Sequence, residues 1–360
     1  MAPPGISPRG AHSRTLMAKQ QLNIRQLAEK AGVSTSTVSR VLNNSGYVRQ
    51  EVRSHVERII AETGYVPSGI AKNLKANRSD TVGIVIPRIN SFASSEITAG
   101  ISTALAEAGL FPLLGNSANT PEQELRYLDI FRGHRVSGVV MLATMITPAH
   151  LEAMRGMGVP VVVVGQDASA QGFVSVIQDE RRATRQMTDY LIRCGHRRIG
   201  LIGVADWDVQ VGCERKGGYL DALHAAGIDP APDHMVTGGF DLSDGAAGID
   251  RLVPFANDVS PSAVLAVTDR LAIGAISRLA ERRLSVPDEV SVAGVGDIDV
   301  AQVYRPKLTT VHFDYYATGR AAARLLIDEL GDAPSAALRH VMPFELRVRD
   351  SVSVRAATPT

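Results

Sequence analysis

The chain of 360 residues is long enough for two or three domains, and with 45% hydrophobic and 21% charged residues it has the composition of an ordinary globular protein. It shows no apolar run long enough for a membrane span and no secretory signal, so we expect a cytoplasmic protein without membrane contact. Its charge is uneven, since residues 1–78 hold 12 Lys and Arg against 4 Asp and Glu, and residues 79–360 hold 26 against 33. A basic head on an acidic body suits a protein whose head meets nucleic-acid phosphates.

A tail at residues 1–20 is rich in Pro, Gly, Ser and Arg, and we expect it to be disordered. Residues 21–66 then predict a compact three-helix domain. The first helix carries apolar residues at helical spacing and ends at a glycine that tolerates φ > 0; these residues are Ile24, Leu27, Ala28, Ala31 and Gly32. Ser34 is a good N-cap for the second helix, and the third runs from about Gln50 to Thr63 before Gly64.

The second helix presents small hydroxyls and one arginine beside an apolar stripe formed by Val38, Val41 and Leu42. The polar residues on and around it are Ser34, Thr35, Ser36, Thr37, Ser39, Arg40 and Asn43. Such side chains near a helix N-terminus suit entry into the major groove of DNA, which favours a helix-turn-helix. A solvated helix in a small bundle would show the same short pattern.

Residues 67–79 separate this head from the rest of the chain, and we interpret them as a hinge. The stretch from Gly69 to Ala76 is too short and too polar to form a stable helix alone, but it could become helical when docked on DNA. A plain linker is the alternative interpretation.

From Thr81 onward, apolar strands alternate with amphipathic helices, the order typical of parallel sheets with helices on both faces. Two successive series of this kind predict an α/β fold with two Rossmann-like subdomains that face each other across a cleft. We assign residues 80–178 and 309–350 to the first subdomain and residues 179–308 to the second. The assignment expects Leu308–Val311 and the helix that begins at Tyr315 to cross back to the first subdomain.

Several motifs run through this pattern. They include Ala31-Gly-Val-Ser34, Thr37-Val-Ser-Arg-Val-Leu-Asn43, Gly64-Tyr-Val-Pro67, Ile70-Ala-Lys-Asn-Leu74, Gly195-His-Arg-Arg-Ile199, Thr268-Asp269 and Leu308-Thr-Thr-Val311. On these motifs, residues 22–350 resemble the LacI/GalR (lactose-repressor) family of transcriptional regulators, which implies a helix-turn-helix head, a hinge and a periplasmic-binding-protein-like body. Stretches such as Asp208-Val-Gln-Val-Gly212 and Gly294-Val-Gly-Asp297 are most similar to the trehalose-repressor branch.

The resemblance implies a pseudo-palindromic, double-stranded DNA operator that is read by a homodimer, with one head on each half-site. It places Thr35, Ser36 and Arg40 at base edges. The residues expected at phosphates or bases are Ser34, Thr37, Ser39 and Asn43. In the hinge it implies DNA contacts by Ala71, Lys72 and Leu74, with Leu74 as an apolar wedge in the minor groove; ordinary linker packing is the alternative for Leu74.

Ligands of open α/β sheets bind beyond the carboxyl ends of the strands, so residues that follow strands are candidates for an effector site. Together with positions that match the family's cleft, the candidates are Arg88, Asn90, Ser91, Phe92, Glu96, Gln166, Asp179, Trp207, Arg215, Asp269 and Asp297. Arg88 precedes a helix that begins near Ser94, which is a good arrangement for binding an anion. The implied effector is a sugar or sugar phosphate, with trehalose 6-phosphate or trehalose as first choices.

Two positions depart from the family's pattern. Ala93 and Ser94 stand where an aromatic pair is usual, so Phe92 and Trp207 are the candidates for a stacking wall, with simple packing as the alternative for Trp207. Gly296 stands where a sugar-binding aspartate is common, which fits a different ligand.

Other function classes have weaker support. A periplasmic-type sugar-binding receptor would share the body, but the basic head argues against it. A sugar-modifying enzyme would need an acid–base pair, a nucleophile or a metal cluster. None stands out, because His196 has no accompanying nucleophile pattern, and Cys194 and Cys213 lack metal-ligand spacing and suit packing. We therefore expect a sugar-responsive repressor that is not an enzyme and needs no cofactor or metal.

Overall fold

The computed structural model describes residues 22–355, apart from residue 43 and residues 66–78, 254–259 and 332–335. The expectations for the tail, for Asn43 and for the hinge residues Ala71, Lys72 and Leu74 therefore lie outside the described residues. The chain divides into two compact units, Met1–Asn77 and Arg78–Thr360, which we describe separately as the head and the body.

The described part of the head has three helices, α1 (Ile24–Lys30), α2 (Thr35–Leu42) and α3 (Gln50–Thr63), as the sequence predicted. They surround a small core of buried apolar residues: Leu27, Ala28, Ala31, Val38, Val41 and Val56. Gly32 and Gly64 adopt φ values of 61° and 62°, which confirms their predicted role after α1 and α3. Ser34 Oγ accepts a hydrogen bond from the backbone N–H of Thr37 at 3.1 Å, so it caps α2.

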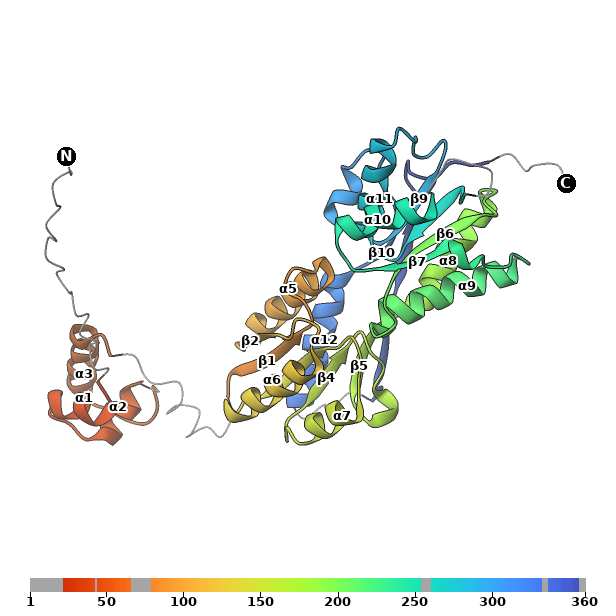
Figure 1. The fold of residues 1–360 in the computed structure, drawn as a ribbon. Helices are drawn as coiled ribbons and strands as arrows, with labels where there is room; N and C mark the ends of the chain where they lie inside the picture. Colours follow the sequence, from red (N-terminus) through yellow and green to blue (C-terminus); the bar gives the residue numbers. More distant parts are fainter. Residues whose placement is uncertain (1–21, 43, 66–78, 254–259, 332–335, 356–360) are drawn as a thin grey trace, which may run out of the picture. The chain divides into compact units, whose positions relative to one another are not determined.

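The first sheet of the body has six strands in the order β11-β5-β4-β3-β1-β2, and neighbouring strands are parallel. They are β1 (Thr81–Ile86), β2 (Phe111–Asn116), β3 (Gly138–Leu142), β4 (Val161–Val164), β5 (Val174–Gln178) and β11 (Arg339–Met342). Helices α5 (Phe92–Glu107) and α12 (Tyr315–Leu330) cover one face, and α6 (Pro121–Gly133) and α7 (Pro148–Arg155) cover the other (Figure 1). A Cβ on Gly100 would lie 2.1 Å from the carbonyl oxygen of Tyr316, so only glycine permits this approach of α5 to α12.

The second sheet also has six strands, in the order β12-β10-β9-β8-β6-β7. They are β6 (Ile199–Val204), β7 (Met235–Gly238), β8 (Ala263–Ala266), β9 (Ser291–Gly296), β10 (Thr309–Phe313) and β12 (Phe344–Arg347), and only β12 runs antiparallel to its neighbour. Helices α8 (Glu180–Arg193) and α9 (Arg215–Ala225) pack together on one face, and α10 (Leu242–Leu252) and α11 (Asp269–Glu281) on the other (Figure 1). The fold is thus the predicted α/β body with two Rossmann-like subdomains.

The expected assignment of residues 309–350 to the first subdomain is wrong for two strands. Strand β10 pairs with β9, and β12 pairs with β10, so both belong to the second sheet. The chain returns to the first subdomain only after β10, through α12 and β11. Strands β5, β11 and β12 were not predicted as strands, and β11 and β12 alternate exposed with half-buried positions instead of forming an apolar run.

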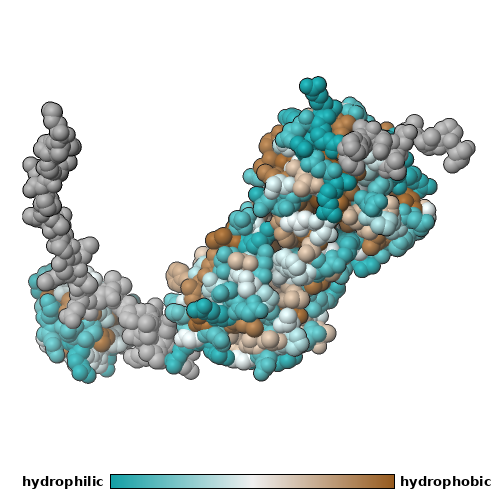
Figure 2. Space-filling view, in the orientation of Figure 1, coloured by the Kyte–Doolittle hydropathy of each residue, from teal (hydrophilic) through white to brown (hydrophobic). Residues whose placement is uncertain are grey.

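The surface of the body carries apolar residues at the edge of the first sheet. Strand β2 is the last strand there, and its side chains Phe111 and Leu114 are 61% and 41% exposed. Figure 2 shows hydrophobic residues near the part of the body that Figure 1 labels β1 and β2. Within the described ranges, no helix is long and apolar enough to cross a lipid bilayer.

Candidate functional site

The candidate DNA-reading surface of the head is the polar side of α2. Val38 and Val41 face the core, whereas Thr35, Ser36 and Arg40 are exposed. These three are the residues that the sequence places at base edges, and the structure leaves their side chains accessible to a duplex. The aliphatic part of the Arg40 side chain lies beside Gly46, in the turn after α2. A Cβ on Gly46 would lie 3.5 Å from Arg40 Cδ.

The other hydroxyls of this segment have structural partners. Ser34 Oγ lies 2.7 Å from Ser36 Oγ and 2.9 Å from Thr37 Oγ1, in addition to capping the helix. Thr37 and Ser39 are half-buried. The hydrogen bonds of Ser34 and Thr37 therefore hold the first turn of α2 in place. They thereby also fix the directions in which the side chains of Thr35 and Ser36 point.

The body contains a cavity of about 570 Å³ between its two subdomains. Its lining comes from segments that follow the strands of both sheets, which is where open α/β sheets bind ligands. The first subdomain contributes residues 87–95 after β1 and residues around Ala143 after β3, and the second contributes residues after β6, β7, β8 and β9. The volume lies in the range of small-molecule sites.

A buried ion pair lies in the wall of the cavity. Arg215, 3% exposed, donates through Nε and Nη2 to the two carboxylate oxygens of Glu180 at 2.8 and 2.9 Å. Its Nη1 donates to the carbonyl oxygen of Val267 at 2.5 Å. Burial disfavours the charged guanidinium, but Glu180 more than compensates and raises the pKa of Arg215. Most donors of Arg215 are therefore engaged within the protein, which fits a role in fixing the cavity wall.

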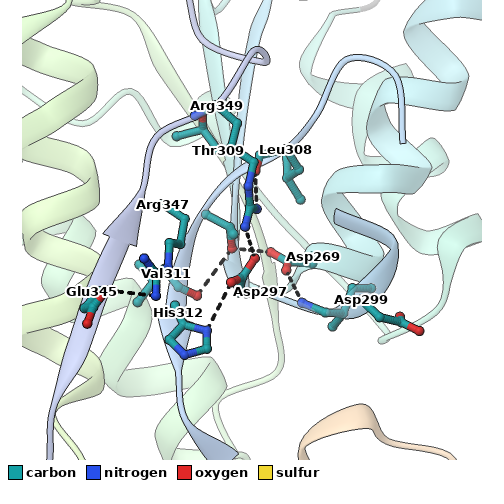
Figure 3. Close-up of polar contacts among 12 residues, drawn as sticks. Asp269, Asp297, Asp299, Leu308, Thr309, Val311, His312, Glu345, Arg347 and Arg349 are labelled. Atoms are coloured by element: carbon teal, nitrogen blue, oxygen red, sulfur yellow. Dashed lines mark hydrogen bonds and ion pairs between the residues drawn. The ribbon is translucent and has the colours of Figure 1, made fainter. Parts of the chain in front are cut away.

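Asp269 is a second buried charge in the lining. It is 1% exposed at the start of α11, where one carboxylate oxygen accepts from Thr310 Oγ1 at 2.5 Å and the other from the backbone N–H of Ile298 at 2.9 Å (Figure 3). Burial raises the pKa of this carboxyl to about 6 despite these hydrogen bonds. Asp269 thus presents a desolvated carboxylate at the cavity, with hydrogen bonds that hold it in one orientation.

Arg88 extends across the cavity from the first subdomain to the second. Its guanidinium carbon lies 3.9 Å from the ring centroid of Phe240, which follows β7. Asp208 and Asp241, both in the second subdomain, are close enough to favour its charge, although burial lowers the pKa of Arg88 overall. Trp207 extends the aromatic group, with its ring centroid 6.4 Å from that of Phe240. Arg88, the predicted anion-binding residue, thus already lies against an aromatic ring and close to carboxylates of the protein itself.

The structure brings six of the predicted effector residues into the cavity lining. They are Arg88, Asn90, Ser91, Phe92, Arg215 and Asp269. The other five do not line it: Glu96, Gln166, Asp179, Trp207 and Asp297.

Four of these five, all but Glu96, have contacts that explain their positions. Gln166 is buried and donates from its side-chain amide to the carbonyl oxygen of Thr144 at 2.9 Å, and Glu96 lies half-buried on α5. Asp179 caps α8 by accepting from the backbone N–H of Arg182. Trp207, 44% exposed, packs against Phe240 outside the lining, as the packing alternative expected.

Asp297 points away from the cavity. It has φ of 53°, and its carboxylate lies 2.6 Å from Nη2 of Arg349 and 3.0 Å from Nδ1 of His312 (Figure 3). Its neighbour Gly296 does line the cavity. The turn after β9 therefore directs the carboxylate behind the wall instead of toward a ligand.

The sequence interpretation missed much of the rest of the lining, including Phe240, Asp241 and Tyr315. Phe240 and Asp241 follow the short strand β7, so the rule that located Arg88 could also have located them. Burial raises the pKa of Tyr315 to about 12, and its ring lies 6.4 Å from that of Phe92. Phe92, Phe240 and Tyr315 are thus aromatic residues of the cavity lining.

The groups that could suggest catalysis have structural contacts. His196 is fully buried between Ser262 Oγ, 3.0 Å from Nδ1, and the carbonyl oxygen of Ser353, 3.1 Å from Nε2. Cys194 is buried and Cys213 is half-buried, and both are free thiols. Across the described ranges, no group of three or more His, Cys, Asp and Glu side chains could hold a metal ion.

Comparison with known sequences identifies both units. Residues 23–68 match the description "Bacterial regulatory proteins, lacI family", and residues 188–352 match "Periplasmic binding protein-like domain". The HTH-type transcriptional repressor CytR of Escherichia coli (strain K12) is 32% identical over 340 residues, which are 93% of this chain and 98% of CytR. The HTH-type transcriptional repressor PurR of Vibrio atlanticus (strain LGP32) is 28% identical over 310 residues, 86% of this chain and 92% of PurR.

Solved structures agree with these matches. A structure described as a "transcriptional regulator CelR-cellobiose complex" is 32% identical with a TM-score of 0.67, over 92% of this chain and 99% of that one. The lac repressor dimer bound to operator and the anti-inducer ONPF shares the fold, with 24% identity and a TM-score of 0.81 over 93% of this chain and 100% of that one. Since CytR matches almost from end to end at 32% identity and the head matches the lacI description, the chain belongs to the LacI family and is a DNA-binding transcriptional repressor.

Proposed function

We propose that this repressor binds a pseudo-palindromic operator as a homodimer, regulates sugar-utilisation genes, and changes its operator affinity when a small sugar or sugar phosphate binds between the subdomains of its body. The observation that carries the proposal is the cavity of about 570 Å³ that both subdomains line. A ligand held by both walls favours one arrangement of the subdomains over another, and this differential binding is what an allosteric effector requires.

The chemistry of the lining supports a polyhydroxyl ligand. Aromatic rings of Phe92, Phe240 and Tyr315 offer apolar faces for a sugar ring, and Asn90 and Asp269 offer groups that bond hydroxyls. The similarity to a regulator solved with cellobiose supports a disaccharide. Among disaccharides, trehalose and trehalose 6-phosphate stay our first candidates, on the sequence resemblance alone.

The path of the chain supports coupling between ligand and operator. The chain passes between the two sheets three times, after β5, after β10 and after β11. Short parallel crossings permit one subdomain to rotate against the other, a hinge motion. We propose that this rotation changes the separation of the two hinges at residues 67–79, which would be helical only in the dimer on DNA.

The exposed edge of the first sheet supports a dimer. An edge strand with exposed Phe111 and Leu114 is a place where a second copy would bury apolar surface. Two-fold symmetry would then present two heads to the two half-sites of the operator.

A gel-shift titration tests the proposed function directly. The full chain is titrated against the DNA upstream of its own gene and against random duplex of equal length. We expect a discrete complex with the upstream DNA only. A thermal-shift screen of sugars and sugar phosphates then identifies binders, because a ligand of the native state raises the melting temperature. Equal binding to both duplexes, or no binder that alters the gel shift, would count against the proposal.

A further inference from the structure

The lining of the cavity carries more negative than positive side chains. It contains three arginines and five carboxylates: Arg88, Arg215 and Arg270 against Glu180, Asp208, Asp241, Asp269 and Asp299. A cavity that receives a phosphate normally offers cationic or N–H donors that are not already neutralised. A phosphate site in this cavity therefore requires that at least one of these three arginines can bind an anion.

Two of the arginines are paired with carboxylates. Arg215 is bidentate to Glu180, and this ion pair is buried, with side chains 4% and 5% exposed. Arg270 lies 3.2 Å from the carboxylate of Asp241. An anion that approached Arg215 would have to compete with a carboxylate held by two hydrogen bonds in a water-poor site, which is a strong contact to displace.

The third arginine, Arg88, is enclosed by the opposite wall. The ring of Phe240 lies 3.9 Å from its guanidinium carbon, and Asp208 and Asp241 act on its charge. Asp208 is only 6% exposed and is held in place by the backbone N–H of Val211. A phosphate at Arg88 would thus bring about two negative charges close to the buried carboxylate of Asp208 and the exposed carboxylate of Asp241.

The same carboxylates are well suited to a different class of ligand. Asp208 and Asp269 are acceptors without a donor hydrogen when ionised, and protein groups hold both in one orientation. A hydroxyl or amino group of a ligand can donate to such an oxygen, whereas the ionised oxygens of a phosphate are repelled by it.

We propose that the cavity selects a ligand without negative charge that presents hydroxyl or amino donors, and that Asp208 and Asp241 are the residues that exclude its phosphorylated counterpart. The proposal rests on the proposed function for the identity of the cavity as the effector site, and it favours trehalose over trehalose 6-phosphate. It also revises the role of Arg88 from an anion receptor to a residue whose charge the second subdomain neutralises.

The test uses inorganic phosphate as the probe and Trp207 as the reporter. Trp207 is the single tryptophan of the chain and packs against Phe240, so its fluorescence responds to the cavity and not to phosphate bound by the basic head. We expect no saturable change in the wild type up to about 10 mM phosphate, with sodium chloride at equal ionic strength as the reference. Saturation of the wild type below that concentration would overturn the proposal.

The variant Asp208→Asn/Asp241→Asn should gain phosphate binding. Asparagine can also cap a helix, so position 208 keeps its structural role while two negative charges are removed. We expect a saturable change with an apparent Kd of about 1 mM or lower, at least tenfold below the highest phosphate concentration used for the wild type. The matched control is Asp229→Asn/Asp233→Asn, which removes the same charge from exposed positions of the same subdomain outside the lining. No gain in the first variant, or an equal gain in the control, would contradict the assignment.

Two additions keep the result interpretable. The single variant Asp241→Asn changes an exposed side chain and should show a smaller gain in the same direction, so the test does not depend on the buried position. Operator binding is measured on each preparation by gel shift. If the wild type does not bind operator, the proposed function is contradicted. If the wild type binds operator and also binds phosphate, only this inference is contradicted.

Discussion

Replacing Asp269 by asparagine should change the free energy of unfolding of the body in a pH-dependent way. Relative to the wild type, the variant should be more stable at neutral pH than at acid pH. Asp269 is 1% exposed, and burial raises the pKa of its carboxyl from 3.8 to about 6. The folded state therefore binds this proton more tightly than the unfolded chain, and the free energy of unfolding falls as the pH rises from about 4 to about 6. This difference in pKa corresponds to about 3 kcal/mol. Asparagine removes the titration, and it can still accept from Ile298 and donate to Thr310 Oγ1.

The assay is urea unfolding followed by the fluorescence of Trp207, which lies in the body. The free energy of unfolding of Asp269→Asn minus that of the wild type should increase by about 2 kcal/mol between pH 4 and pH 7, because the unfolded carboxyl is already more than half ionised at pH 4. The control Asp233→Asn removes an exposed carboxylate from the same subdomain, and its difference from the wild type is measured at the same pH values. A constant difference for Asp269→Asn would refute the reasoning, because the carboxyl would then have the same pKa in the folded and unfolded states.

Three further predictions concern the head, the ion pair and the dimer. Arg40→Ala should lose about 1–3 kcal/mol of discrimination between operator and random DNA in gel shifts, because a bidentate base contact is lost; equal weakening on both duplexes would argue for a phosphate contact. Glu180→Gln should lower the free energy of unfolding by about 3–5 kcal/mol, since it leaves Arg215 buried without its counter-charge, and urea unfolding that matches the wild type would exclude this. Phe111→Lys should shift sedimentation from dimer toward monomer if β2 lies in the interface; an unchanged dimer would place the interface elsewhere.

Local signals were sufficient for the head and for the strands with apolar runs. The helices of the head follow from apolar spacing, a serine cap and two glycines with positive φ, all of which are properties of neighbouring residues. Strands β1, β3 and β4 are continuous apolar runs buried on both faces, which the sequence displays directly. The strands β11 and β12 lack this signal, and membership of β10 in the second sheet depends on pairing with β9, which no local pattern encodes.

The candidate site was predictable in position but not in side-chain direction. Proximity to a strand end correctly placed Arg88 and Asp269 in the lining. It failed for Asp297, because a backbone with φ of 53° turns this side chain toward Arg349. It also could not show that Arg88 meets Phe240, since the two residues belong to different subdomains and become neighbours only when the cleft is formed.

The two buried or half-buried arginines of the cavity wall, Arg88 and Arg215, differ in how they would respond to motion of the subdomains. Arg215 and its partner Glu180 belong to the second subdomain, so their ion pair persists when the cleft opens. Arg88 contacts Phe240 across the cleft, so opening breaks that contact. A partly desolvated cation–π contact contributes about 0.5–2 kcal/mol, enough to change the ratio of closed to open forms severalfold. Under the proposed function, an effector would act on a cleft that already has a closing contact, and its allosteric effect would be the difference between the closing contacts it adds and those it displaces.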